Sequence, residues 1–371
     1  MTRPGRTPGL EAARALATIV VVAGHAALSY METPIGWAVQ DTSRSVVVDF
    51  LVWVGRQVAM PCFFFLAGYS ARAVLARGAA SFVRQRLRRL ALPLVALLVP
   101  MSIATTALWS WGRALVPRDS VAAGVPALRS SGLPVNLGHL WYLYYLLVLS
   151  ALLLVAVAAT RAVRRGAPAA PPGGEPRLAR WGAFPVVLAV PTAACLFVAG
   201  KLQVDTPLGF AVDPVIAAYF ATFFVGGYLA HAWPATLTTA AAHCGRHALV
   251  AAALVGGTVP ALLASRTAGG APPPAFAWLT SAASSWFLVC ALLGASVRWL
   301  SRPGPWLGAV GAASYWTYLV HLPLVVLLQV VASQLTLPGP VEYAVIAGTG
   351  IAAPVWLYTR AIGRTSLARV V

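Results

Sequence analysis

Residues 11–30 read EAARALATIVVVAGHAALSY, a run of apolar and small residues long enough to cross the hydrocarbon core of a bilayer as one helix. Runs of this kind recur along the whole chain of 371 residues, which is 59% hydrophobic and only 10% charged. A soluble protein of this size with buried core helices would need many more charges to cover its surface. We therefore predict an all-α polytopic membrane protein.

The chain contains about ten stretches of adequate length, and we predict a bundle of about ten transmembrane helices. If the N-terminus lies in the cytoplasm, 19 of the 27 Lys and Arg residues fall on cytoplasmic segments, as the positive-inside rule requires. This bias predicts a multi-pass protein of the cytoplasmic membrane with both termini cytoplasmic. It also explains the formal charge of +18 without nucleic acid as a partner. The predicted spans are residues 11–30, 46–70, 90–111, 139–160, 181–200, 212–231, 247–264, 276–297, 308–334 and 341–361.

We interpret residues 1–371 as a single transmembrane domain, because neither end offers a separate soluble catalytic domain. The Pro-, Gly- and Arg-rich segment 161–180 is interpreted as a flexible inner linker, and residues 112–138 as an outer loop or lid. The four cysteines form no CxxC pair, and they show neither a disulfide pattern nor a metal pattern.

The first predicted helix carries two ionisable residues, Arg14 and His25, inside its apolar run. They are 11 residues apart, close to three helical turns, so they share one face at a separation of roughly 16 Å along the axis. Ionisable side chains inside a membrane are functional candidates by default. Arg14 has an alternative interpretation, in which it snorkels to the inner headgroups beside Glu11. His25 lies deeper and is a candidate acid or base.

Two further groups of charges lie in or beside the next predicted spans. Asp49 and Arg56 are seven residues apart on one helix face, where they form either part of a substrate site or a structural ion pair. Arg86 and Arg89 belong to a dense arginine cluster on the inner side. This cluster either sets topology by contact with anionic lipid or binds the phosphates of a cytosolic ligand.

The remaining candidates lie on later spans, at the depth of His25. His139, Trp141 and Tyr142 begin the fourth predicted span near the outer interface, and His321 lies in the outer half of the ninth. Three histidines at one depth of a bundle predict a polar cavity. A zinc site is the competing interpretation, but the histidines lack ligand spacing and few carboxylates accompany them, so we predict no metal.

Taken together, these motifs resemble those of acyltransferase family 3, the integral-membrane acyltransferases. The Arg14-x10-His25 pair is similar to the defining motif of that family, and FFFLAGY at 63–69 resembles its Phe-Phe-Leu-Ser-Gly segment, with Ala in place of Ser. The arginine motif that precedes Pro93, SYWTYLVHLP at 314–323 and YFATFFVGGYLAH at 219–231 resemble further family segments. GHLWYL at 138–143 is similar to the branch that includes glucan-succinylating proteins. We expect no extracytoplasmic esterase-like domain, which some members carry.

The resemblance implies O-acyl transfer, usually of acetyl, from acyl-CoA to a hydroxyl of a carbohydrate or another acceptor. In this scheme His25 is the general base, Arg14 orients the donor, and Arg86 and Arg89 bind CoA phosphates. His139, Trp141, Tyr142 and His321 would form acceptor-side walls, with Arg56 and Asp49 as further substrate contacts. Membrane lipids complete the expected partners.

Two rival functions fit some of the same residues. A transporter or channel for a small polar solute would also place charges and histidines in a cavity, although the chain shows no internal repeat and no pair of Gly/Pro-broken helices. A flippase-like protein that carries acyl groups for another enzyme is the second rival.

Overall fold

The computed structural model describes residues 8–33, 35–115, 135–164, 175–176, 182–267 and 275–370, and its secondary structure there is helical apart from one isolated bridge between Met31 and Ser45. The predicted linker and outer loop fall largely outside these residues. The helices are α1 (Pro8–Ala27), α2 (Val46–Leu75), α3 (Ala79–Arg86), α4 (Leu92–Leu115), α6 (Trp141–Arg164), α8 (Phe184–Ala199), α9 (Pro214–Ala232), α10 (Ala235–Ala242), α11 (Cys244–Thr267), α12 (Ala275–Trp299), α13 (Pro305–Ala332) and α14 (Gly339–Arg360).

Nine helical segments in the described part of the chain are long and apolar enough to cross a membrane, which confirms the predicted class of fold. The tenth prediction, residues 181–200, corresponds to α8, which has only 16 residues. At 1.5 Å per residue α8 extends about 24 Å, less than a typical hydrocarbon core. It ends because Gly200 adopts the left-handed conformation, and it packs against α9 and α12.

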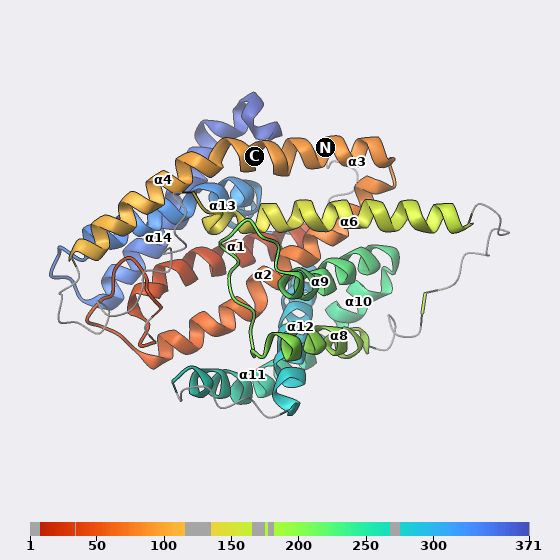
Figure 1. The fold of residues 1–371 in the computed structure, drawn as a ribbon, viewed down its shortest axis with the longest axis horizontal. Coiled ribbons are helices and arrows are strands. Elements are labelled where there is room, and N and C mark those ends of the chain that lie inside the picture. Colours follow the sequence, from red (N-terminus) through yellow and green to blue (C-terminus); the bar gives the residue numbers. More distant parts are fainter. Residues whose placement is uncertain are drawn as a thin grey trace.

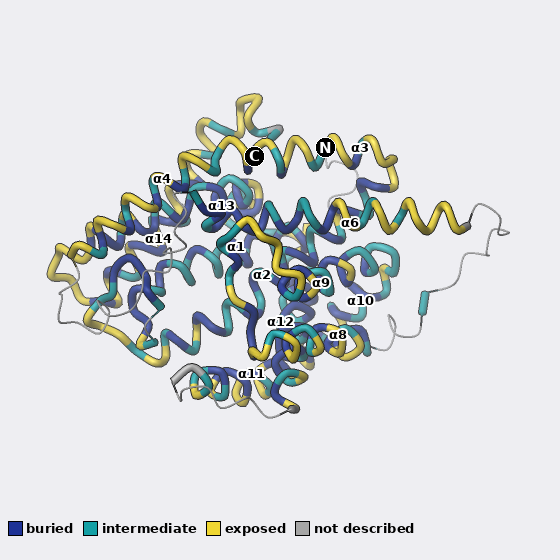
Figure 2. Tube along the Cα trace, in the orientation of Figure 1, coloured by how far each residue is buried: buried dark blue, intermediate teal, exposed yellow. Residues whose placement is uncertain are grey.

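The helices pack into an elongated bundle in which α3 and α4 run in line along one edge and α11 lies at the opposite edge (Figure 1). Burial is concentrated on the inner helices, whereas the outward side of α4 and the far end of α6 are exposed (Figure 2). Many of the exposed side chains are large and apolar, among them Val95, Val155 and Leu249. Because apolar surface of this extent is unfavourable in water, we assign these faces to lipid contact.

Helices α2 and α9 cross at very short range through two glycines. A Cβ atom on Gly68 would lie 1.8 Å from the carbonyl oxygen of Phe224, and one on Gly227 would lie 1.8 Å from that of Phe65. Small residues at such crossings allow backbones to approach closely inside membranes. The motifs at 63–69 and 219–231 therefore have a packing role, which is to join the two helices that flank one side of the site.

Helices α1 and α13 run in the same direction and touch along their length. Arg14 donates from Nη2 to the carbonyl of Gly311 at 2.9 Å, and His25 lies against His321. The two contacts are 11 residues apart on α1 and ten residues apart on α13, in the same chain direction. These contacts confirm that Arg14 and His25 share a face. The parallel pairing agrees with the predicted ten crossings, in which α8 is counted. In that order α1 is the first crossing and α13 the ninth, and both run outward from the cytoplasmic side.

Candidate active site

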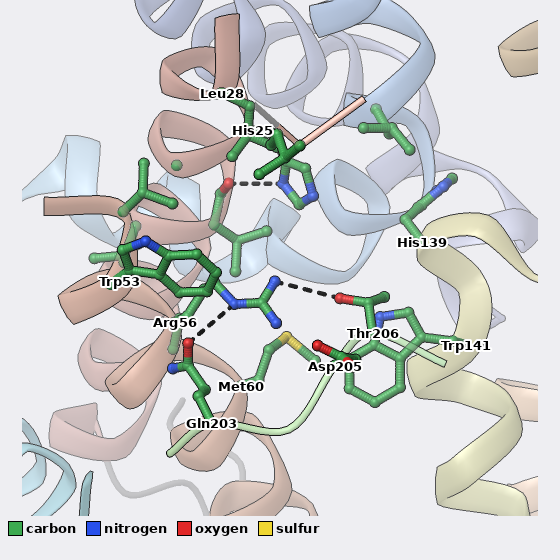
Figure 3. Close-up of a pocket in the computed structure, with 18 of the residues that line it drawn as sticks. His25, Leu28, Trp53, Arg56, Met60, His139, Trp141, Gln203, Asp205 and Thr206 are labelled. Atoms are coloured by element: carbon green, nitrogen blue, oxygen red, sulfur yellow. Dashed lines mark hydrogen bonds between the residues drawn. The ribbon is translucent and has the colours of Figure 1, made fainter. Parts of the chain in front are cut away.

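A cavity of about 510 Å³ lies between α1, α2, α13, the start of α6 and the segment 203–208. These parts of the chain belong to the side of the bundle predicted to face outward. Figure 3 shows His25, Arg56, His139 and Trp141 around this space. The walls also contain three tryptophans from other segments, so that four indole rings line one cavity: Trp37, Trp53, Trp109 and Trp141.

His25 lies on α1 and lines the cavity. Its Nδ1 atom is 2.9 Å from the carbonyl oxygen of Val21, one turn earlier in the same helix. Because a carbonyl oxygen only accepts hydrogen bonds, Nδ1 carries the proton in the neutral ring. The Nε2 atom therefore holds a lone pair, and Figure 3 shows this nitrogen directed away from the α1 backbone. A neutral imidazole with this tautomer can remove a proton from a hydroxyl group in the cavity.

His139 and His321 extend the line of imidazole rings that begins at His25. The ring centroids lie 5.0 Å apart for His25 and His321, and 5.4 Å apart for His139 and His321. The 3₁₀ turn η3 (Gly138–Leu140) carries His139, whose Nε2 is 2.9 Å from the carbonyl oxygen of Leu319. Pro323 lacks the N–H that would bond this carbonyl within α13. The proline of the HLP motif thus creates the acceptor that orients His139.

Arg56 projects from α2 into the cavity, where oxygen atoms of the segment 203–206 accept hydrogen bonds from its guanidinium. It donates to Gln203 Oε1 and to Thr206 Oγ1, both at 3.3 Å (Figure 3). It also donates to the carbonyl of Val204 at 3.2 Å. It also lies 5.3 Å from the ring centroid of Trp53. These contacts fix one wall of the cavity and keep a cation there, within electrostatic range of His25.

Asp49 is directed elsewhere, and it does not line the cavity. Its carboxylate accepts hydrogen bonds from the backbone N–H groups of Glu32 at 2.7 Å and Thr33 at 2.9 Å, and from the Thr33 hydroxyl. The two residues of the predicted ion pair, Asp49 and Arg56, thus bind different partners. Asp49 anchors the segment that follows α1, because two backbone N–H groups at a chain reversal need a buried acceptor.

Tyr142 also lies outside the cavity, on the side of the bundle that faces the arginine cluster. Its hydroxyl donates to the carbonyl of Phe63 at 3.2 Å, and it interacts electrostatically with Arg86 and Arg14. Trp141 and Tyr142 are adjacent in sequence, but successive residues of a helix point about 100° apart. Arg14 and Arg86 thus lie within electrostatic range of Tyr142, and we call these three residues the inner cluster. The Tyr142 ring lies 6.5 Å from that of Trp141, so this cluster adjoins the cavity wall that Trp141 forms.

Arg86 is the inward-facing member of its cluster. Its guanidinium lies 4.7 Å from the ring centroid of Phe82, and among the described residues its buried Nε and Nη2 atoms have no hydrogen-bond partner. Buried donors without partners are rare in folded proteins and point to a missing ligand or water. Arg89 has an exposed side chain, and its carbonyl, which Pro93 leaves without a helical donor, accepts a hydrogen bond from Tyr315.

Several residues of the site were not predicted from the sequence. Gln329 of α13 donates to the carbonyls of His25 and Ala26, both at 3.0 Å, and accepts from Trp37 Nε1 at 2.9 Å. A buried amide within the apolar run VVLLQVV was a usable signal, because polar groups inside membranes need partners. Trp37 and Gln203 lie in connecting segments, where no helical periodicity marks a buried face.

Within the described ranges no group of three or more His, Cys, Asp or Glu side chains is arranged to hold a metal ion. The model of a protein family described as an acyltransferase domain matches residues 7–359. Comparison with curated proteins and with solved structures gives no significant match.

Proposed function

This chain belongs to acyltransferase family 3 and is a membrane acyltransferase, and we propose that it moves a short acyl group from cytosolic acyl-CoA to a hydroxyl outside the membrane. Acetyl is the expected acyl group, and the acceptor is a carbohydrate or another cell-envelope or secreted molecule. The observation that carries the proposal is the 2.9 Å contact between His25 Nδ1 and the Val21 carbonyl, which favours a lone pair on Nε2 beside a cavity on the predicted outer side. We propose the cytoplasmic membrane as the location, with both termini in the cytosol and residues 1–371 as one domain.

The lining of the cavity supports a carbohydrate acceptor. Indole faces pack against the C–H faces of sugar rings, and the cavity offers four of them together with polar edges from Arg56, Gln203 and Thr206. Its volume of about 510 Å³ lies in the range of small-molecule sites. Membership of the glucan-succinylating branch remains a prediction from the GHLWYL segment.

The inner cluster supports a phosphorylated donor. Arg86 has buried donor atoms without partners in the described part of the chain, and both Arg86 and Arg14 lie within electrostatic range of Tyr142. Arg89 adds charge at the predicted cytosolic end. Arginine recognises phosphate through several parallel N–H groups. A CoA nucleotide bound at Arg86 and Arg89 would direct its thioester arm along α1, past Arg14, toward His25.

The proposed reaction is a direct transfer. Nε2 of His25 takes the proton of the acceptor hydroxyl as the oxygen attacks the thioester carbonyl. The C–S bond breaks, the CoA thiolate leaves, and the proton returns from His25 to sulfur. The products are an ester and free CoA, and no external oxidant or reductant takes part. Arg14 orients the donor carbonyl or balances the charge that develops on it.

The test uses purified wild type and His25→Ala in nanodiscs with acetyl-CoA and a panel of methyl glycosides as acceptors. Loss of a general base lowers turnover roughly 10²–10⁴-fold, so we expect His25→Ala to bind CoA but to acetylate the glycosides at least about a hundredfold more slowly than wild type. His243→Ala is the matched control, because His243 lies between α10 and α11, outside the cavity. Absence of CoA binding and turnover in the wild type would instead support a transporter.

A further inference from the structure

His321 of α13 is the group in closest contact with the proposed base. Its Nε2 atom lies 3.4 Å from Nδ1 of His25, and the two rings meet edge to face at 60°. The side chain is fully buried, with an exposed fraction of 0%. The sequence analysis placed His321 in the cavity wall as a substrate contact, and the structure adds this second contact, to another histidine 296 residues away.

The hydrogen bonds of His321 fix which of its nitrogens carries the proton. Nδ1 is 2.8 Å from the carbonyl oxygen of Tyr318, so Nδ1 is the donor in the neutral ring. Nε2 therefore holds a lone pair, and it faces Nδ1–H of His25. The same N–H also lies 2.9 Å from the Val21 carbonyl, so two acceptors share it. Both acceptors favour the one tautomer that leaves Nε2 of His25 free to act as a base.

We infer that His321 is the positioning residue of the acyl transfer proposed above: it holds His25 in the reactive tautomer and stabilises the imidazolium that forms when His25 takes the proton. In that state the contact becomes a charge-assisted hydrogen bond, which is roughly twice as strong as a neutral one. The proton itself stays on His25 Nε2 until it passes to sulfur. This inference rests on the proposed function.

The groups around His321 fit a neutral hydrogen-bond acceptor rather than an ion pair. Among the described residues, the other titratable groups that face it are His139 and Tyr318, and Arg56 acts electrostatically on His25 from α2. His139 already donates its own Nε2–H to the Leu319 carbonyl, which holds its ring against the far side of His321. A neutral imidazole between these groups avoids the cost of a buried unpaired charge.

Two polar replacements separate positioning from simple packing. In His321→Gln the side-chain oxygen can reach the place of Nε2 and accept from His25. In His321→Asn the amide is one bond shorter, so it can bond the Tyr318 carbonyl but does not reach His25. The Gln and Asn side chains have similar polarity, so the two variants differ mainly in whether His25 Nδ1–H has an acceptor at position 321. His321→Leu removes both bonds and serves as the extreme case.

The assay is acetyl transfer from acetyl-CoA to methyl glycosides by full-length protein in nanodiscs, with bound CoA measured separately. We expect His321→Asn and His321→Leu to lower kcat roughly 10²-fold, within the usual range for disturbed base catalysis, with KM for acetyl-CoA changed less than about twofold. We expect His321→Gln to recover activity to within about tenfold of wild type.

The outcomes separate this inference from the proposed function. If the wild type transfers acetyl and Asn and Gln replace His321 equally well, positioning by His321 is refuted while the acyltransferase stands. An increase in KM with unchanged kcat would also refute it and return His321 to a substrate contact. If the wild type neither binds CoA nor transfers acetyl, both proposals fail. Should His321→Leu fail to fold, the comparison of Gln with Asn still decides.

Discussion

Gln329 links the backbone at His25, the proposed base, to Trp37 in the cavity wall, and replacing it with methionine tests whether that link shapes the site. Methionine has nearly the same length and volume but cannot donate or strongly accept hydrogen bonds. The change removes three bonds, two to the carbonyls of His25 and Ala26 at 3.0 Å and one from Trp37 Nε1 at 2.9 Å. It leaves the buried indole N–H of Trp37 without its acceptor.

The expected loss of stability follows from the number of bonds. Hydrogen bonds inside membrane proteins contribute about 0.6–1 kcal/mol each, so Gln329→Met should lower the free energy of unfolding by about 2–3 kcal/mol. Because Trp37 then loses its anchor over His25, whose ring centroid lies 6.1 Å away, KM for the acceptor should rise. KM for acetyl-CoA should stay unchanged, since the inner cluster is not touched.

Unfolding in mixed SDS micelles, followed by circular dichroism, measures the first effect, and acetyl transfer measures the second. A double-mutant cycle with Trp37→Phe isolates the bond between the two side chains, with an expected coupling of about 0.6–1 kcal/mol. Gln334→Met is the matched control, because Gln334 is exposed beyond the end of α13. Unchanged stability and unchanged acceptor KM in Gln329→Met would refute the link.

Two further predictions concern the donor side and the packing of the bundle. Replacing Arg86 and Arg89 with Gln together should raise KM for acetyl-CoA roughly a hundredfold, because each charge-assisted bond to phosphate contributes at least about 1.4 kcal/mol. The same change at the exposed Arg84 and Arg88 should leave KM within about threefold, and equal effects of both pairs would assign the cluster to lipid contact. Gly227→Leu should abolish folding or cost more than about 3 kcal/mol, since even a Cβ there lies 1.8 Å from a backbone oxygen of α2; normal stability by thermal unfolding would contradict the close crossing of α2 and α9.

The sequence correctly predicted those features that depend on neighbouring residues along one helix. Apolar runs such as 11–30 specify spans because a bilayer rewards length and composition alone. The shared face of Arg14 and His25 follows from the helical repeat, and both residues do contact α13. The predicted end of the span at residue 200 also agrees with α8, which ends at Ala199 because Gly200 adopts the left-handed conformation, although the helix begins only at Phe184.

The partners of each polar group, by contrast, depended on packing between distant segments. Helical spacing placed Asp49 and Arg56 on one face, but the segments 31–33 and 203–206 supply their actual partners. Trp141 and Tyr142 were both predicted as acceptor walls, but only Trp141 lines the cavity, and Tyr142 packs behind it with the ring centroids 6.5 Å apart. Sequence spacing describes the geometry of a single helix. The partner of a polar group depends on which atoms of other segments lie within about 3 Å of it in the folded chain.

The sequence by itself therefore determined the membrane helices, the acyltransferase family and the presence of a histidine and an arginine on one face of α1. The tertiary structure alone decided that His25 faces a cavity lined by tryptophans, that Nε2 of His321 lies 3.4 Å from its Nδ1, and that the Leu319 carbonyl, which Pro323 leaves without a helical donor, lies against His139. The reason is physical. Burial in a bilayer is a property of a local run of residues, but the tautomer of an imidazole is set by hydrogen bonds that, for His25 and His321, cross 296 residues of chain.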